Sequence, residues 1–382
     1  MVSLALFLLI TQPDRKKSIL IFLVIALYFP MNLYIPTTMQ ESVNQSIAIL
    51  FAAFLIHFSG EEKHSIVLIL ASLLVLVFGS FLRLTWILVA FPLFFLLQVK
   101  RSNAWRGIAI LVPLIFSVGM GFVYLTWVSQ YPEGFLYQLS LQTSVLSSLK
   151  IIFEHTFTNL ISFLSISNKS SVLEIFLRYQ FLIILALFIF VGKINERLQR
   201  TNVFLMASSL LITLAFYDIN RWTDFRTLAP FLLIGLLSLV SSADNLIVKR
   251  MLYLYLISNV LVFPFFIKAY LDFHVDHFKG TKDPAADIFA KKLGGIEYLP
   301  GASPWCNSIL SSHMIYEEIR LLPAGIGLNQ LMPPFDKGNP VKSHYLFTSQ
   351  DFLVQQGLLE TCRPVYSDNG EVFCIRTDDG CQ

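Results

Sequence analysis

Three arginines stand out because each lies where a long apolar run begins or ends. Arg221 and Arg226 belong to the charged stretch Asp218–Arg226 between two such runs, and Arg83 separates two others. A guanidinium binds phosphate bidentately and keeps its charge at any physiological pH, so these residues are suited to an anionic lipid head group. There are simpler interpretations. The stretch that contains Arg221 and Arg226 can be a solvated loop with internal Asp–Arg pairs, and Arg83 can be a single arginine whose side chain extends to the membrane surface.

Two further groups of polar residues have side chains that can do chemistry. Glu174 and Arg178 are four residues apart, which places both on one face of a helix; a structural ion pair is the simpler interpretation and a ligand site the alternative. In the long segment 130–171, Glu154 and His155 have the side chains for acid–base chemistry. Because Ile151–Leu164 is amphipathic, a helix that lies along a membrane surface explains them without catalysis.

The cluster after the last apolar run, Asp272, His274, Asp276 and His277, has the composition of a metal site but not the spacing of a zinc site. Polar residues are also expected directly outside a membrane span. The sequence contains no glycine-rich phosphate loop, nucleophile elbow or Walker pattern. We therefore expect no bound metal and no cofactor, and the sequence assigns no catalytic residue.

The composition indicates the environment of these residues. Of the 382 residues 55% are hydrophobic and 14% are charged, whereas soluble domains carry about 25% charged residues. This excludes an ordinary soluble enzyme, a disordered chain and a nucleic-acid binder. Residues 1–270 carry 19 Lys and Arg against 11 Asp and Glu, and residues 271–382 carry 9 against 14 together with all four cysteines. We expect a multi-span transmembrane domain over 1–270 and a small soluble domain over 271–382.

The apolar runs predict an α-helical polytopic membrane protein. A helix that crosses about 30 Å of hydrocarbon needs about 20 mostly apolar residues. By this criterion we expect about nine or ten spans, and nine of them are assigned to residues 19–36, 45–59, 65–82, 84–98, 107–129, 172–192, 202–217, 227–243 and 251–270.

Loop charge predicts the orientation, because Lys and Arg are retained on the cytoplasmic side. One set of alternate loops holds 12 basic residues, and the other set, which includes Arg83, Arg221 and Arg226, holds five. The loop 130–171 and the tail are therefore expected outside the plasma (inner) membrane. The cysteines agree, since all four lie in the tail, in a compartment that permits disulfides.

The N-terminus does not fit a simple span. Met1–Ile10 is apolar but covers only about 15 Å as a helix, and basic residues follow it, whereas in a signal peptide they precede the apolar run. The segment is either a short first helix or the remainder of a longer protein whose beginning is absent. The second interpretation is favoured, because half a span leaves backbone groups unsatisfied in lipid.

The tail has the pattern of a small extracytoplasmic α/β domain. The expected elements are strands at 308–310, 344–348, 364–367 and 371–376 and helices at 283–292, 316–322 and 350–359. Asp368-Asn369-Gly370 between the last two strands is a strong hairpin signal. One or two disulfides should form, and the sequence does not distinguish the three possible pairings of Cys306, Cys362, Cys374 and Cys381.

Two short motifs resemble those of the C-type membrane glycosyltransferases, multi-spanning enzymes that take a sugar from a polyprenyl-phosphate carrier on the outer side of the membrane. Ser80–Trp86 is similar to the family's Arg-Pro-Glu hairpin, with Leu84 and Thr85 in place of Pro and Glu. Arg226–Leu233 resembles the family's Arg-Tyr-Leu-x-Pro-Leu-Leu helix start without its Tyr, and an outer soluble domain follows the last span. These motifs cover only part of residues 60–382.

The resemblance implies a carrier-phosphate role for Arg221 and Arg226 and a pocket-lining role for Arg83. It implies no catalytic residue. The family's catalytic carboxylate lies in a large outer loop after the first span, whereas the first outer loop here, residues 37–44, has only Glu41. Either that part belongs to a missing N-terminal segment or the resemblance is restricted to the scaffold.

The sequence is therefore compatible with two functions. The first is a glycosyltransferase, or its C-terminal part, whose partners are the lipid bilayer and a polyprenyl-phosphate-linked sugar. The alternative is a non-enzymatic transporter or envelope assembly factor whose tail binds a partner. Charges that cluster at the outer surface rather than at the midplane favour the first. The sequence does not indicate an oligomeric state.

Overall fold

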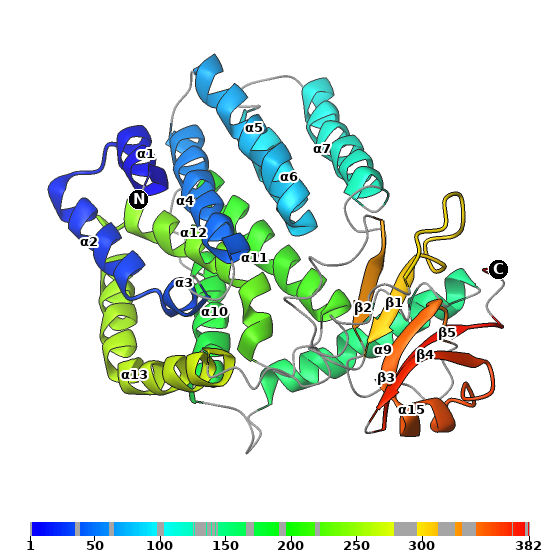
Figure 1. The fold of residues 1–382 in the computed structure, drawn as a ribbon. Helices are drawn as coiled ribbons and strands as arrows, with labels where there is room; N and C mark the ends of the chain where they lie inside the picture. The colour runs from blue at the N-terminus through cyan, green and yellow to red at the C-terminus, as the bar shows by residue number, and fades with distance from the viewer. Residues whose placement is uncertain are drawn as a thin grey trace. The chain divides into compact units, whose positions relative to one another are not determined.

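The computed structural model divides into two units, Met1–Val128 with Ile152–Leu271 and Ser129–Ile151 with Asp272–Gln382 (Figure 1). It describes residues 2–34, 39–60, 65–97, 103–124, 126, 135, 139, 142, 144–165, 172–190, 196–217, 222–278, 296–311, 325–330, 341–368, 370–378 and 381. The backbone alone is described for residues 33–34, 39–41, 103–106, 108–109, 222–224, 272–278, 328–330 and 368.

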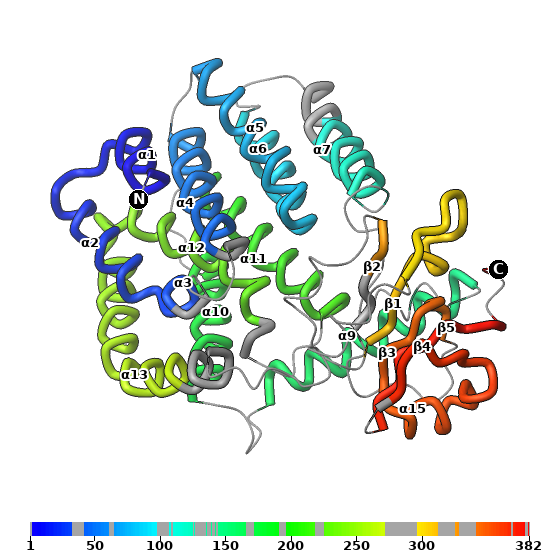
Figure 2. Tube along the Cα trace, in the orientation of Figure 1, coloured from blue at the N-terminus to red at the C-terminus, as the bar shows by residue number. Residues whose placement is uncertain are grey.

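The first unit is helical. Figure 2 follows its chain trace, in which α9 and α13 each continue into residues of the second unit. Its helices are α1 (Val2–Thr11), α2 (Arg15–Ala26), α3 (Phe29–Tyr34), α4 (Met39–Gly60), α5 (Ile66–Leu82), η1 (Leu84–Val89), α6 (Ala90–Leu97), α7 (Asn103–Val123), α9 (Val145–Leu164), α10 (Val172–Phe190), α11 (Glu196–Phe216), η3 (Trp222–Thr227), α12 (Ala229–Ser241) and α13 (Leu246–Phe278).

Helix α12 forms the centre of this unit, because every residue from Ala229 to Val240 is buried. A helix that is apolar on all sides must be covered on all sides. It packs against α2, α4, α10 and α11. A Cβ at Gly235 would lie 3.1 Å from Sδ of Met206, so glycine at this position allows α11 to approach α12 closely.

Three of the described helices are long and apolar enough to cross a membrane, namely Ser42–Gly60, Val172–Phe190 and Leu246–Leu271. Shorter apolar helices occur at Val2–Thr11, Ile66–Leu82, Leu84–Leu97, Ile110–Val123 and Ala229–Ser241. Large apolar side chains are exposed on the outside of the unit, among them Leu74, Phe122, Phe153 and Leu261. The predicted helical fold with apolar, membrane-compatible helices is confirmed, while the number of spans and their orientation stay predictions.

Several predicted spans differ in detail from the helices. The span 19–36 consists of α2 and α3, because Pro30 cannot donate the hydrogen bond that a continuous helix needs. The span 84–98 begins as the 3₁₀ helix η1 and continues as the short α6, which contains Pro92. Residues 39–44, expected in a loop, form the first turns of α4.

The second unit contains a five-stranded sheet of order β2-β1-β3-β5-β4. Strands β1 and β2 and strands β1 and β3 pair in parallel, and β5 is antiparallel to both β3 and β4. The elements are β1 (Ser308–Ser311), β2 (Gly327–Gln330), β3 (Tyr345–Ser349), α15 (Gln350–Gln355), β4 (Cys362–Asp368) and β5 (Glu371–Arg376).

Both faces of this sheet are apolar. Ile309, Phe347 and Phe373 are buried in a cluster on one face, and Leu310 and Leu346 belong to a cluster on the other. Because side chains alternate along a strand, neighbouring residues of β1 and β3 contribute to different clusters. The strands therefore appear in the sequence as short continuous apolar runs rather than as alternating ones.

The predicted strands and hairpin of the tail are confirmed where the structure describes them, while its extracytoplasmic location stays a prediction. The hairpin reverses between Asp368 and Glu371, which pair across β4 and β5, and Gly370 has the positive φ of +81° that this turn requires. The helix predicted at 350–359 is the shorter α15, and β2 was not predicted. The helices expected at 283–292 and 316–322 lie outside the described residues.

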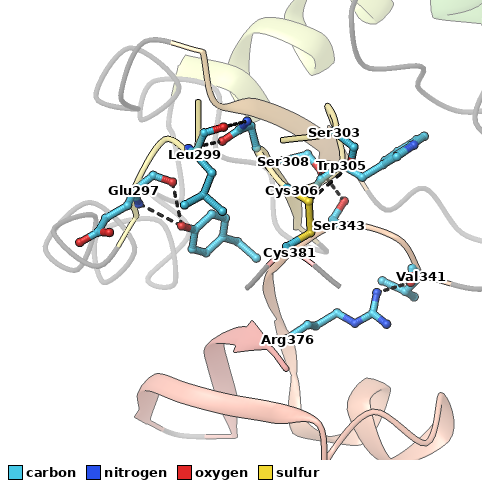
Figure 3. Close-up of a disulfide and its surroundings, with 12 residues drawn as sticks. Glu297, Leu299, Ser303, Trp305, Cys306, Ser308, Val341, Ser343, Arg376 and Cys381 are labelled. Carbon is cyan, nitrogen blue, oxygen red and sulfur yellow. Dashed lines mark hydrogen bonds between the residues drawn. A yellow bond between two sulfur atoms is a disulfide. The ribbon is translucent and has the colours of Figure 1, made fainter. Parts of the chain in front are cut away.

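Two disulfides form, Cys306–Cys381 and Cys362–Cys374. Figure 3 shows the first of them, which joins the segment before β1 to the C-terminal residues next to Ser308 and Ser343. The second crosses between the adjacent strands β4 and β5. The sequence predicted disulfides in this unit, and the fold determines how the cysteines pair.

Candidate functional site

Two turns that are far apart in the sequence meet at one end of α12. Arg83 is the residue between α5 and η1, and Arg226 lies in the last turn of η3, shortly before α12. Nη1 of Arg83 donates a hydrogen bond to the backbone carbonyl oxygen of Arg226 at 3.1 Å. The structure therefore brings together two of the three arginines that the sequence singles out, and the third, Arg221, lies outside the described residues.

Trp86 holds the turn that carries Arg83. Its backbone N–H donates to the Arg83 carbonyl oxygen at 3.0 Å, which starts η1. Its indole is buried, with ring centroids 5.4 Å from Phe51 and 5.5 Å from Phe231. A Cβ at Gly79 would lie 3.2 Å from Cγ of Trp86, so glycine at this position lets the indole pack against α5. Aromatic packing thus fixes the backbone of Arg83.

The turn that carries Arg226 is held on both sides of the arginine. Phe225 is buried and packs edge-on against Phe181, with 6.3 Å between ring centroids. The hydroxyl of Thr227 lies 3.2 Å from the hydroxyl of Thr213 in the interior. The Arg226 side chain between them is exposed, and no carboxylate that the structure describes lies within 4.0 Å of its guanidinium. It is available to an anion that approaches from outside the protein.

The start of α12 adds to the positive potential here. The helix begins with Ala229 and Pro230, three residues after Arg226. The N-terminal end of an α-helix carries a partial positive charge, which favours anions within the first turn. Two guanidinium-bearing turns and this helix end therefore make a place that attracts a phosphate or another anion.

Buried polar side chains lie next to the Arg83 turn. Nε1 of Trp86 donates to Oδ1 of Asn44, in the early part of α4, at 2.8 Å. Asn44, Gln45 and Thr85 are buried, yet Nδ2 of Asn44, both amide atoms of Gln45 and Oγ1 of Thr85 have no hydrogen-bond partner among the described residues. Buried polar groups are ordinarily paired, since each unpaired group costs about 1–3 kcal/mol. Asn44 and Thr85 therefore bring unpaired polar atoms to the Arg83 turn.

Sequence reasoning missed Asn44, Gln45 and Thr85. Asn44 and Gln45 lie at the border between a predicted loop and a predicted span, where polar residues are ordinary. Thr85 was noted only as a replacement within the Arg83 hairpin motif. The hydrogen bond from Trp86 to Asn44 brings Asn44 next to the turn that contains Thr85, and it depends on the packing of α4 against η1.

The predicted pairing of Glu174 with Arg178 is confirmed. Nη2 of Arg178 forms an ion pair with Oε1 of Glu174, and both side chains are buried. Nη1 of Arg178 also donates to the carbonyl oxygen of Ser162 at 2.6 Å, and its guanidinium carbon lies 5.6 Å from the ring centroid of Phe163. The pair connects α9 to α10, which supports the structural interpretation over a ligand site.

Helix α9 contains the predicted helical segment 151–164, and one of its faces caps α11. Nδ2 of Asn159 donates to the carbonyl oxygens of Leu214 and Tyr217 at 2.8 and 2.7 Å, and Nδ1 of His155 lies 3.2 Å from the carbonyl oxygen of Ala215. The last carbonyls of a helix lack partners within the helix. His155 therefore contributes to a helix cap, and Glu154 beside it is exposed.

The structure describes no metal centre in the residues that it covers, since no three His, Cys, Asp or Glu side chains there are grouped to hold an ion. The side chains of Asp272, His274, Asp276 and His277 lie outside that part of the chain.

Comparisons with protein-family models, with curated proteins and with solved structures found no match to this chain. The functional interpretation therefore depends on the geometry around Arg83 and Arg226.

Proposed function

We propose that this protein is a multi-spanning membrane glycosyltransferase, which binds the phosphate of a polyprenyl-phosphate-linked sugar at Arg83 and Arg226 on the outer face of the membrane. The observation that carries the proposal is the hydrogen bond between the two arginine-bearing turns, 143 residues apart in the sequence. Buried aromatic side chains fix both turns before a ligand binds. Such preorganisation reduces the ordering cost of binding.

A second basic residue lies at the other end of α12. Nζ of Lys17 forms an ion pair with Asp244, shortly after α12 ends, at 2.6 Å. Asp14 accepts a hydrogen bond from the backbone N–H of Lys17, which lowers the pKa of its carboxyl group. Lys17 and Arg226 thus lie near opposite ends of one helix about 20 Å long. The two basic residues therefore lie at opposite ends of α12, as the proposed topology requires.

The proposed reaction breaks the bond between the sugar's anomeric carbon and the carrier phosphate. The guanidinium groups stabilise the negative charge that develops on the leaving phosphate. An acceptor hydroxyl forms the new bond to the anomeric carbon and gives its proton to a general base. We assign no residue to that base.

Binding of farnesyl phosphate tests the phosphate site, with farnesol as the uncharged control of the same chain. We expect Arg226→Ala to weaken binding of farnesyl phosphate about tenfold or more, because a hydrogen bond to a charged group contributes about 1.5–3 kcal/mol. Arg226→Lys should recover part of the loss, since Lys lacks the planar fork. Farnesol binding should not change.

The design separates ligand binding from folding. Arg226→Ala retains the backbone carbonyl that accepts from Arg83, so the contact between the turns is preserved. Arg83→Ala removes that contact and should weaken binding as well. Arg200→Ala is the matched control, because Arg200 is an exposed arginine of α11 that pairs with Glu196. If Arg83→Ala and Arg226→Ala leave binding of farnesyl phosphate unchanged, the phosphate site is wrong.

Topology and transfer are tested separately. An alkaline phosphatase fusion after Gln382 should be active and one after Arg200 inactive; equal activity would contradict the proposed orientation. Transfer is measured as release of polyprenyl phosphate from polyprenyl-phosphate-linked sugars by membranes that contain the protein. Binding without release for every donor would favour the non-enzymatic transporter or assembly factor.

A further inference from the structure

An apolar cavity of about 410 Å³ lies between α10, α12 and α13. The residues that line it are mostly aliphatic or aromatic and include no charged side chain. Two of its walls, α10 and α13, are among the helices long and apolar enough to cross a membrane. Its residues Tyr179, Ile183 and Leu254 are exposed. The cavity therefore opens at the apolar outer surface of the helical unit, which a bilayer would cover with hydrocarbon chains.

One end of the cavity lies where α10 and α12 end and α13 begins. Leu187 is in the last turn of α10, Leu239 in the last turn of α12 and Met251 in the second turn of α13. Arg226 precedes the first residue of α12, at the opposite end of that helix. This end of the cavity is therefore the one remote from the proposed carrier-phosphate site.

Two cations precede the part of α13 that lines the cavity. Lys249 and Arg250 are exposed, and no carboxylate that the structure describes lies within 4.0 Å of either charged group. Arg250 is four residues before Leu254, so the two side chains lie on one face of α13, and Leu254 lines the cavity. Nζ of Lys249 lies 5.9 Å from the ring centroid of Tyr253, which is exposed. A positive charge thus lies one helical turn from the apolar wall of the cavity.

The start of α2 adds further positive charge at this end. The ion pair between Lys17 and Asp244 joins α2 to the turn between α12 and α13. Arg15 and Lys16, which precede Lys17, are exposed. Asp14 accepts a hydrogen bond from the backbone N–H of Lys17, so the two carboxylates described in these turns both contact Lys17. The exposed charges that remain are cationic.

An anionic phospholipid matches both halves of this arrangement. Its phosphate lies at the polar surface of the bilayer, and its acyl chains extend into the hydrocarbon core. Clusters of Lys and Arg at a membrane surface attract anionic lipids, and guanidinium and ammonium groups bind phosphate. A soluble phosphate would use the cations but not the cavity, and a plain hydrocarbon would use the cavity but not the cations.

We propose that the cavity holds one acyl chain of an anionic phospholipid, whose phosphate is bound by Arg250 and Lys249. The cations at the start of α2 attract the head group, and the apolar lining contacts the chain. The proposal concerns binding alone. It does not depend on the phosphate site at Arg83 and Arg226, which lies at the other end of α12.

Dioleoylphosphatidylglycerol is the probe, and the melting temperature of the full chain in uncharged detergent is the measurement. Dioleoylphosphatidylcholine is the control with the same chains and a phosphate but no net charge. Glycerol phosphate is the control that carries the phosphate without chains. We expect a saturable rise in melting temperature with dioleoylphosphatidylglycerol, a much smaller rise with dioleoylphosphatidylcholine and none with glycerol phosphate at the same concentrations.

Charge variants test the head-group contact. Arg250→Gln and Lys249→Gln each remove one cation and should raise the Kd of dioleoylphosphatidylglycerol about fivefold. Arg363→Gln is the matched control, because it removes the same charge from an exposed arginine of the C-terminal unit. It should leave the Kd unchanged.

Two bulky variants test the cavity without a change of charge. Leu239→Phe fills it from α12, and Ile183→Trp places a large side chain at its open side. Each should raise the Kd about tenfold or more, because the acyl chain loses the burial of about two or more CH₂ groups. Cooperative melting of each variant without lipid shows whether it folds, and Ile183 is 52% exposed, so its replacement does not disturb the core.

Equal stabilisation by the two phospholipids, with the Kd unchanged in Arg250→Gln and Lys249→Gln, would show a cavity for any lipid chain and overturn the proposal. An unchanged Kd in both Leu239→Phe and Ile183→Trp would overturn it too, because the head group would then bind at the surface without the cavity. Stabilisation by glycerol phosphate equal to that by dioleoylphosphatidylglycerol would indicate a site for a soluble anion instead.

Discussion

In the C-terminal unit, buried polar side chains hydrogen-bond to their neighbours. The amide of Asn307 accepts from the N–H of Leu299 at 2.8 Å and donates to its carbonyl oxygen at 3.0 Å. The hydroxyls of Ser308 and Ser343 lie 2.9 Å apart next to the Cys306–Cys381 disulfide (Figure 3). Among the described residues of this unit, Thr348 alone has a buried side-chain oxygen without a partner.

The helical unit differs, because it leaves polar atoms of several buried side chains unpaired within the described residues. These residues include Asn44, Gln45, Thr85, Gln180 and Tyr255. Two of them, Asn44 and Thr85, lie at the Arg83 turn. Within the described residues, the buried polar groups of the sheet unit are therefore almost all paired, whereas several of those in the helical unit are not.

The two units are also stabilised by different means. The helical unit has a large apolar core around α12, whereas the sheet has two small clusters and two disulfides. Small domains bury too little surface for a core to suffice, so covalent links compensate. Substitutions that change packing or buried charge should therefore lower the stability of the helical unit. Substitutions that remove disulfides should lower the stability of the sheet unit.

The largest effect is expected at the buried ion pair of the helical unit. Glu174→Gln should lower the free energy of unfolding by about 3–5 kcal/mol, because the buried guanidinium of Arg178 loses the negative charge that compensates it. Denaturation by SDS in detergent micelles measures this. Glu196→Gln is the matched control, since its pair with Arg200 is exposed and should contribute about 1 kcal/mol or less. Equal losses in the two variants would contradict the buried character of the first pair.

The next largest effect is expected when the disulfides of the sheet unit are removed. Cys306–Cys381 closes a loop of 75 residues and Cys362–Cys374 one of 12. Loop-closure entropy predicts losses of about 4 and about 3 kcal/mol when each pair is replaced by serine. Hydrogen exchange of the β1 and β5 amides should report both losses, while the melting of the helical unit should not change. An equal loss of protection from hydrogen exchange in α12 would contradict the conclusion that the disulfides stabilise only the sheet unit.

A smaller effect is expected where α9 caps α11. Asn159→Ala removes two hydrogen bonds to the carbonyl oxygens of Leu214 and Tyr217, which should cost about 2 kcal/mol. Faster hydrogen exchange confined to the end of α11 and to α9 is the expected result. Thr158→Ala, on the exposed face of the same helix, is the control and should have little effect. Unchanged exchange in Asn159→Ala would mean that water caps these carbonyls.

The smallest expected effect is a pH dependence of the stability of the sheet unit. Burial raises the pKa of the Asp378 carboxyl group, but its hydrogen bond of 3.0 Å from Arg376 outweighs this and holds the pKa below the ordinary value. A carboxyl whose folded-state pKa is lowered stabilises the fold above the unfolded-state pKa, and this stability is lost as pH falls through the folded value.

The wild-type sheet should therefore lose stability between about pH 5 and pH 2 more steeply than Asp378→Asn, by about 1 kcal/mol or less because Asp378 is partly exposed. Exchange of β5 amides in the two proteins, compared at each pH, measures the difference. A difference that does not vary with pH would contradict the assignment to Asp378.

Features that depend on residues close in sequence were predictable. The apolar runs predicted helices, the four-residue spacing predicted the Glu174–Arg178 pair, and Asp368–Gly370 predicted the hairpin. In each case the interacting residues lie within one turn of helix or one tight turn of chain, so local geometry alone brings them together.

The tertiary structure decided what depends on distant residues. The pairing of Cys306 with Cys381, the strand β2 and the contact between Arg83 and the carbonyl of Arg226 each join segments that the sequence does not relate. The strand β2 has the sequence Gly-Leu-Asn-Gln, with no apolar run, and is held by its parallel pairing with β1. Local propensity carries no information on such pairings, because they are selected by the packing of whole helices and strands. The sequence identified arginines that suit a phosphate, and only the packing of η1 and η3 against α12 brought two of them to one place.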